Sequence, residues 1–182
     1  MACYKQVDGK QILICYPTGA RGDFLASILC GTIQREFKQY KILNPGPYKK
    51  LHSSIELEDV DPLQFITICI RLRNLDDYLT VAYLRKSKMS SALTYTEILQ
   101  DLITNQNKIA QTNYKFQCVV DFKWLFDVKK IQELYTQITS QELDSTTINC
   151  IQHNISLQQW AGINVSNSIG SNVMPWTNAS SW

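Results

Sequence analysis

The stretch that decides the fold is residues 11–29, which read QILICYPTGARGDFLASIL. Residues 11–16 form a short, continuously apolar run, which suits a strand covered on both faces, as in a parallel sheet. Residues 17–22 then break the pattern with turn residues. Apolar residues recur at three- and four-residue intervals from Asp23 to Tyr40, which predicts an amphipathic helix with an acidic first turn and a weak point at Gly31. A strand, a tight turn and a helix make the first half of a βαβ unit.

The rest of the chain alternates strands with helical segments. We expect further strands at residues 48–52, 64–72 and 116–122. The expected helices begin after a capping Asn74 and at the capping-box pattern of residues 94–97, and later cover residues 128–138 and 145–160. This pattern predicts an α/β fold, with a mainly parallel central sheet of about four or five strands between two layers of helices. We expect one domain over residues 1–161 and a polar, Ser/Asn-rich C-terminal tail over residues 162–182.

Composition and charge exclude several classes of protein. The 182 residues are 45% hydrophobic and 19% charged, and no apolar run approaches the ~18–20 residues that a membrane-spanning helix needs. The net charge of +2 does not indicate nucleic-acid binding. Six cysteines without a C-x-x-C pair, and an N-terminus without a signal peptide's apolar stretch, predict a cytoplasmic, reducing location. Neither the cysteines nor the two histidines have the spacing of a metal site.

The turn after the first strand is the first candidate site. Ligands of open parallel sheets bind beyond the carboxyl ends of the strands, which is where residues 17–23 are expected to lie. Gly19 and Gly22 would let the backbone approach a phosphate or sulfate closely, and Arg21 would add a fork of donors. A structural strand-to-helix turn without a ligand is the alternative, because a G-x-x-G spacing is short and common. The turn lacks the Gly-Lys-Ser/Thr ending of a Walker loop, which argues against an ATPase, a GTPase or a small kinase.

Three segments resemble sulfotransferase motifs, in the order in which that family carries them. Residues 12–29 look like the first strand, 5′-phosphosulfate loop and first helix, where the family has a Pro-Lys-Ser-Gly-Thr-Thr-Trp-Leu type of loop. Residues 66–86 resemble the 3′-phosphate motif, and residues 119–138 are similar to a later strand and helix. The residues that match the 3′-phosphate motif are Arg71 or Arg73, Asp77, Thr80 and Tyr83. The resemblance implies a P-loop-type, sulfotransferase-like α/β fold.

The resemblance also implies an activity, a cofactor and a set of site residues. The implied reaction is sulfuryl transfer from 3′-phosphoadenosine 5′-phosphosulfate to an unknown hydroxyl acceptor, with His52 as the catalytic base. The residues implied to bind the cofactor are Thr18, Gly19, Ala20, Arg21, Gly22, Asp23, Arg71, Arg73 and Thr80. The sequence departs from the family at Thr18, which stands in place of the loop lysine, and the loop is one residue longer. The late Arg-Lys-Gly segment is absent and the chain is short for the family.

These departures keep a second interpretation open, in which the chain is a non-catalytic P-loop-like domain that serves as a structural or partner-binding module. The tail carries Trp176 and Trp182, and exposed tryptophans anchor protein partners well because each offers a large apolar area. His52 is then a surface or capping residue. The two arginines then pair with one of the carboxylates of Asp76, Asp77 and Asp121 instead of with a phosphate.

Overall fold

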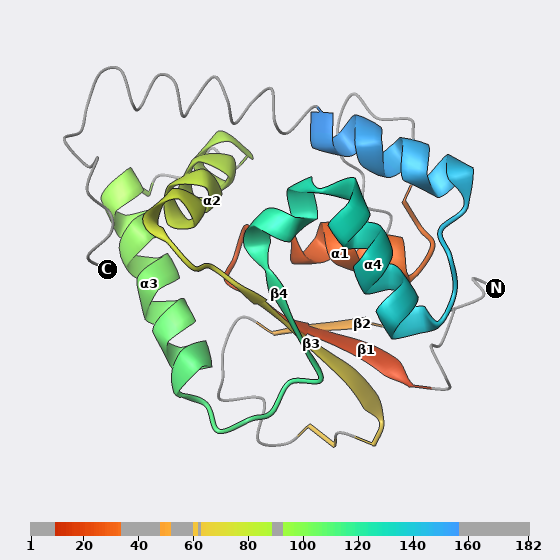
Figure 1. Ribbon diagram of the computed structural model, residues 1–182. Helices are drawn as coiled ribbons and strands as arrows, with labels where there is room; N and C mark the ends of the chain where they lie inside the picture. The colour runs from red at the N-terminus through yellow and green to blue at the C-terminus, as the bar shows by residue number, and fades with distance from the viewer. Residues whose placement is uncertain (1–9, 34–47, 52–59, 62, 89–92, 157–182) are drawn as a thin grey trace.

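The structure is a computed structural model of the chain, and it describes residues 10–33, 48–51, 60–61, 63–88 and 93–156 (Figure 1). The predicted tail over residues 162–182 lies outside these residues. Within the described ranges, none of the helices combines the length and the apolar character that a membrane span requires.

A parallel sheet of four strands forms the centre of the fold, and it confirms the predicted α/β class. The strand order is β2-β1-β3-β4, so β1 pairs with a neighbour on each of its edges. Their bounds are β1 Gln11–Cys15, β2 Tyr48–Leu51, β3 Phe65–Arg71 and β4 Cys118–Asp121. The chain adds β2 on one side of β1 and then returns to add β3 on the other. The boundary between β1 and β3 is therefore a topological switch point, the place where open parallel sheets bind ligands.

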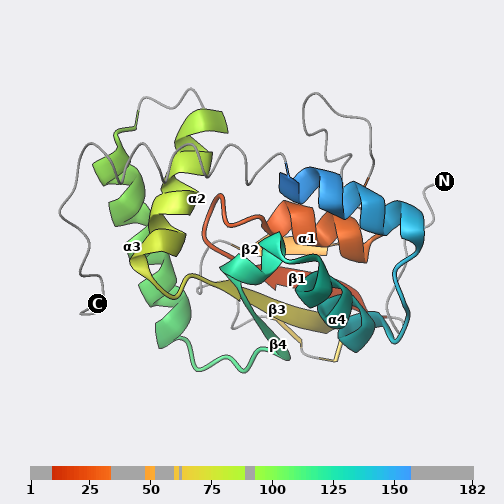
Figure 2. The same ribbon diagram turned by 45° about the horizontal axis from the view of Figure 1, so that its top comes forward.

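One face of the sheet carries the larger core. Ile12 and Ile14 of β1 and Ile68 and Ile70 of β3 alternate along their strands, so they point to the same face. Three helices cover this face: α1 (Gly22–Leu29), α4 (Val128–Thr139) and the helix at residues 145–156. Figure 2 shows these three helices gathered on one side of the sheet.

The opposite face packs a smaller cluster, made by the residues that alternate with those of the first face. Leu13, Cys15, Phe65 and Cys69 form one buried cluster with Ile109, near the end of α3 (Tyr95–Gln111). α2 (Leu75–Lys88) follows the carboxyl end of β3 and packs side by side with α3 (Figure 1).

α1 is shorter than the sequence predicts. It ends at Leu29, because Gly31 takes a left-handed conformation with φ of 67°. The N–H of Gly31 donates to the Ile28 carbonyl and the N–H of Thr32 donates to the Ser27 carbonyl, which together make a Schellman C-cap. The prediction of one helix as far as Tyr40 is therefore wrong, since the predicted weak point at Gly31 is the helix end. Residues 34–40 lie outside the described part of the chain.

The α-helices that follow begin at side-chain caps, two of which the sequence predicts. The Asn74 side chain accepts a hydrogen bond from the Asp77 N–H at the start of α2. Thr94 and Glu97 make the predicted capping box at α3, each side chain accepting from the other's backbone N–H. Asp127 caps α4 and Asp144 caps the helix at residues 145–156. β4 begins two residues later than its predicted 116–122, and it ends at Asp121 because a 3₁₀ helix, η2 (Phe122–Phe126), follows it directly.

Removing one of these caps should weaken the fold measurably. We expect Thr94→Ala to lower the free energy of unfolding by about 1 kcal/mol, because an orphan N–H of α3 loses its acceptor. Thr96→Ala, an exposed change in the same turn, should alter it by less than about 0.5 kcal/mol. Urea denaturation of both variants measures the difference, and equal losses would contradict a capping role for Thr94.

Candidate functional site

The segment between β1 and α1 is a tight turn whose first glycine is required twice. The Ala20 N–H donates to the Pro17 carbonyl at 2.9 Å, and Gly19 has φ of 95°, as the third residue of a type II turn does. A Cβ at Gly19 would lie 3.3 Å from Val81 Cγ1 and 3.4 Å from Arg85 Cβ, both on α2. The turn therefore packs closely against α2, at the end of the sheet where the switch point lies.

The backbone of this turn alternates in handedness. Gly19 and Arg21 have φ of 95° and 60°, whereas Ala20 and Gly22 between and after them are right-handed or extended. Such alternation turns successive N–H groups toward one concave side, which is the geometry of anion-binding nests. The turn leads directly into the first turn of α1, whose N–H groups carry the positive end of the helix dipole.

Among the described α-helices, α1 is the one whose N-cap side chain makes no capping hydrogen bond. Its N-cap residue is Arg21, whereas the other four described α-helices each have an Asn, Thr or Asp cap. The helix start is buried, with Ala20 and Gly22 inside the fold. Orphan N–H groups at a helix start are satisfied by side chains, water or ligands, so a ligand oxygen is a fitting partner here.

Asp23, in the first turn of α1, acts against an anion. Its Oδ1 accepts a hydrogen bond of 3.1 Å from the Tyr16 hydroxyl, and its side chain is half-buried. A carboxylate at this place is stabilised by the helix dipole and repels a phosphate. Its predicted place beside a ligand thus carries an electrostatic cost for binding.

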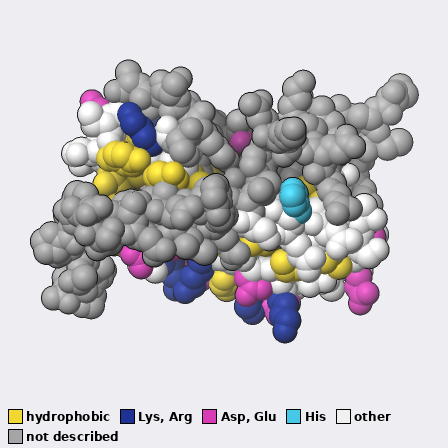
Figure 3. All heavy atoms as spheres, turned by 90° about the horizontal axis from the view of Figure 1, so that it is seen from above, with side chains coloured by type: hydrophobic (Ala, Val, Ile, Leu, Met, Phe, Trp, Pro, Cys, Tyr) yellow, Lys and Arg dark blue, Asp and Glu magenta, His cyan; other side chains and the backbone are white. Residues whose placement is uncertain are grey.

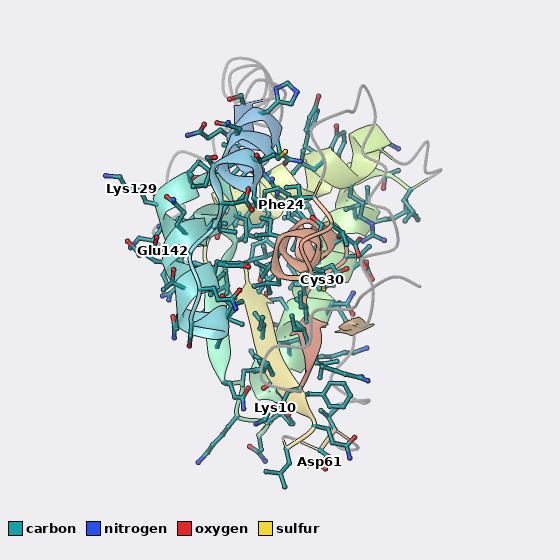
Figure 4. All side chains as sticks on the ribbon, turned by 90° about the vertical axis from the view of Figure 1, so that its right-hand side faces the viewer. Lys10, Phe24, Cys30, Asp61, Lys129 and Glu142 are labelled. Carbon is teal, nitrogen blue, oxygen red and sulfur yellow. The ribbon has the colours of Figure 1, made fainter. Side chains whose placement is uncertain are left out.

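The side chain of Arg21 does not extend from the turn as predicted. Its guanidinium carbon lies 3.9 Å from the ring centroid of Phe24 and 4.4 Å from that of Phe126. One of its terminal nitrogens donates to Asn154 Oδ1 at 2.7 Å. Arg21 is only 8% exposed, and Phe24 is labelled in Figure 4 on the side of α1 that faces the helix at residues 145–156. The guanidinium therefore joins α1, η2 and the last described helix.

Gly22 has a packing role that the spacing of the glycines does not reveal. A Cβ at Gly22 would lie 2.2–2.3 Å from three atoms of the Tyr16 ring, far inside contact distance. The glycine thus makes room for a tyrosine of its own turn, whereas the sequence predicts that it makes room for a ligand.

Substitution of the glycine should show this packing constraint. We expect Gly22→Ala to lower the free energy of unfolding by about 2–3 kcal/mol, because the Tyr16 ring must move. Gly31→Ala adds the same methyl group where, apart from the chain neighbours, no atom of the described residues lies within 4 Å, so only left-handed strain of about 1 kcal/mol is expected there. Urea denaturation compares them, and a loss no larger than that of Gly31→Ala would show that the ring moves freely.

Arg71 and Arg73, at the carboxyl end of β3, both pair with Asp121, one of the three carboxylates that the sequence offers them. Arg71 lies opposite Asp121 in the register of β3 and β4. Arg73 Nε donates to Asp121 Oδ1, and a terminal nitrogen of Arg71 lies 3.6 Å from the same oxygen. The arginine side chains nevertheless remain 43% and 51% exposed, and Arg71 Nε has no hydrogen-bond partner among the described residues. One buried carboxylate thus partly neutralises two cations.

Asp77, a member of the predicted 3′-phosphate motif, is part of the helix start. Its Oδ2 accepts from the Arg73 N–H at 2.8 Å, beside the Asn74 cap. Burial raises the pKa of the Asp77 carboxyl, and the two backbone hydrogen bonds oppose that shift only in part. Thr80 follows on the same helix, half-buried, next to the Val81 that contacts the turn.

The raised pKa of Asp77 predicts a pH dependence of stability. The folded state holds the proton at a higher pH than the unfolded state, so acidification from about pH 7 to about pH 4 favours folding at this group. The isosteric Asp77→Asn lacks this contribution. The free energy of unfolding of wild type relative to Asp77→Asn should therefore rise as the pH falls. Urea denaturation across this range tests it, with the exposed Asp76→Asn as the control. A relative stability that falls would contradict the burial effect.

The structure brings the predicted residues together only in part. The carboxyl ends of the neighbouring strands β1 and β3 lead into residues 18–23 and into Arg71 and Arg73, respectively. α2 brings Thr80 to the same end of the sheet. His52 lies outside the described residues, although its chain neighbour Leu51 pairs with Cys15 at this same end. Sequence reasoning missed Phe126 and Asn154, which contact Arg21. It also missed Arg85, whose short basic cluster is typical of solvated surface but which packs beside Gly19 and pairs with Asp101.

The described residues at this end of the sheet do not favour a nucleophilic thiol or a metal site. Cys15 and Cys69 are register partners, and burial raises the pKa of each thiol to about 12, so the thiolate needed for nucleophilic attack is disfavoured. Within the described ranges, no three His, Cys, Asp or Glu side chains are grouped as a metal ion requires.

Comparisons of the chain with protein-family models, with curated proteins and with solved structures find no match in any of the three.

Proposed function

We propose that the chain binds a phosphate- or sulfate-bearing nucleotide at the turn between β1 and α1. The observation that carries the proposal is the start of α1, which is buried, has an N-cap side chain that makes no capping hydrogen bond, and follows a turn of alternating handedness. Its place beside the switch point of the sheet supports the same conclusion. The exposed parts of Arg71 and Arg73 add positive charge at the same edge.

The ligand class that we propose is 3′-phosphoadenosine 5′-phosphosulfate, with sulfuryl transfer as the activity of a sulfotransferase-like P-loop fold. In that reaction the sulfur–oxygen bond to the 5′-phosphate breaks as an acceptor hydroxyl bonds to sulfur. The hydroxyl proton passes to His52, and N–H groups of the turn stabilise the charge on the departing phosphate. Support for this finer proposal comes from the order of the three motif-like segments in the sequence.

A second candidate function is a non-catalytic module that binds a protein partner. The pairing of both Arg71 and Arg73 with Asp121 favours it, because much of their charge is neutralised within the chain. Exposed apolar side chains also occur on α3, where Tyr95 is 45% and Ile103 is 38% exposed. Figure 3 shows hydrophobic side chains together at the end of the molecule where α2 and α3 lie. In this function the tryptophans of the tail would serve as anchors.

Calorimetric titration with adenosine 3′,5′-bisphosphate separates the two candidates. We expect wild type to bind with micromolar affinity, and Asp23→Asn to bind about five-fold more tightly, because it removes a charge of about 1 kcal/mol repulsion and keeps the acceptor for Tyr16. Glu142→Gln, an equal change of charge at an exposed position labelled in Figure 4, should leave the affinity unaltered. Absence of binding by wild type and Asp23→Asn at millimolar ligand would favour the partner-binding module.

A further inference from the structure

We propose that Phe126 and Asn154 are positioning residues for the ligand turn, because they hold Arg21 in the left-handed conformation that shapes it. The effect on ligand binding rests on the proposed function, whereas the effect on the backbone of Arg21 rests only on the contacts of its side chain. Phe126 comes from η2 and Asn154 from the helix at residues 145–156, so the turn is shaped by the carboxyl-terminal part of the described chain.

The conformation of Arg21 requires a cause outside its own turn. Arg21 has φ of 60° and ψ of 23° at the N-cap of α1, whereas N-cap residues are ordinarily extended. The left-handed region costs a residue with a Cβ roughly 1–2 kcal/mol, and such residues persist where their surroundings over-determine them. Ser140 is the other described non-glycine residue with positive φ, but it lies at the C-cap of α4, where this conformation is ordinary.

The contacts of the Arg21 side chain supply that cause. The guanidinium lies between the rings of Phe24 and Phe126, and Asn154, 133 residues away in the sequence, accepts its hydrogen bond. Cation–π contacts strengthen when the cation is desolvated, and a buried guanidinium that loses an acceptor carries a large penalty. The side chain is therefore held against α1, η2 and the helix at residues 145–156, which restricts the backbone conformations open to Arg21.

The conformation at residue 21 decides where the next N–H groups point. Arg21 stands between Gly19 and Gly22, so a change of its φ to a negative value would end the alternation that makes the nest. Anion binding at the turn and packing of the helix at residues 145–156 are consequently linked. By reciprocity, an anion in the turn should also stabilise the contact between Arg21 and Asn154.

Two substitutions of Arg21 test whether its backbone or its guanidinium matters to the ligand. Arg21→Gly and Arg21→Ala both remove the side chain, but glycine enters the left-handed region without cost and alanine does not. Titrated with adenosine 3′,5′-bisphosphate, Arg21→Ala should bind about five- to ten-fold more weakly than Arg21→Gly. Equal affinities of the two variants, whether both retained or both lost with circular dichroism unchanged, would overturn the proposal.

A measurement without ligand keeps the inference separate from the proposed function. The ¹³Cα and ¹Hα chemical shifts of residue 21 report its backbone conformation in nucleotide-free protein. We expect Asn154→Leu and Phe126→Leu to move these shifts away from left-handed values. Asn154→Asp, which keeps an acceptor for the guanidinium, should restore them. Unmoved shifts in both leucine variants would overturn the inference. Moved shifts in a protein that binds no bisphosphate would refute the proposed function and leave the positioning role intact.

Discussion

The pairing of β1 on both of its edges is the constraint on which the rest of the structure depends. This strand of five residues pairs in parallel with β2 and with β3, and both faces of a parallel sheet are ordinarily covered. Ile12 and Ile14 satisfy one face, and Leu13 and Cys15 satisfy the other. Because β1 lies inside the sheet, the chain leaves it at the switch point and must turn there before α1 can cover the sheet.

At the carboxyl end of the strands, most polar groups find hydrogen-bond or ion-pair partners within the chain. Gln106 of α3 accepts the Leu72 N–H, and the Asp77 carboxylate accepts the Arg73 N–H. Asp121 pairs with the two arginines. Buried polar groups are ordinarily satisfied in this way, so these contacts are as expected for a stable edge. The start of α1 differs from these groups because its N-cap side chain makes no capping hydrogen bond, and our proposal places the ligand there.

Each residue of the turn between β1 and α1 serves more than one requirement. Gly19 fits both a type II turn and the surface of α2, and Gly22 admits the Tyr16 ring. Arg21 joins three elements that lie far apart in the sequence. A turn held this firmly is pre-organised, which favours binding because little conformational entropy is lost when a ligand arrives. The carboxylate of Asp23 works in the opposite direction, because its charge repels the anion that we propose as the ligand.

Local interactions are what the sequence determined by itself. The pattern of apolar residues predicted all four described strands and the α-helices, but not the 3₁₀ helix η2. The caps at Asn74 and Thr94 were predicted because their partners lie three residues away. The helix after the turn was predicted too long. A glycine such as Gly31 lowers helix propensity, but the helix ends there because the hydrogen bonds of the Schellman cap form.

Only the tertiary structure decided the strand order and the partners of the charged residues. The sequence offered three carboxylates as partners for Arg71 and Arg73. Asp121 is the partner because the register of β3 with β4 places it opposite Arg71. Arg21 donates a hydrogen bond to Asn154, which lies 133 residues away, and no local sequence pattern predicts such a contact. The physical reason is that the chemistry of a charged or aromatic side chain, known from the sequence, fixes only the kind of partner it can bind. Which residue of that kind lies close enough is fixed by the chain topology.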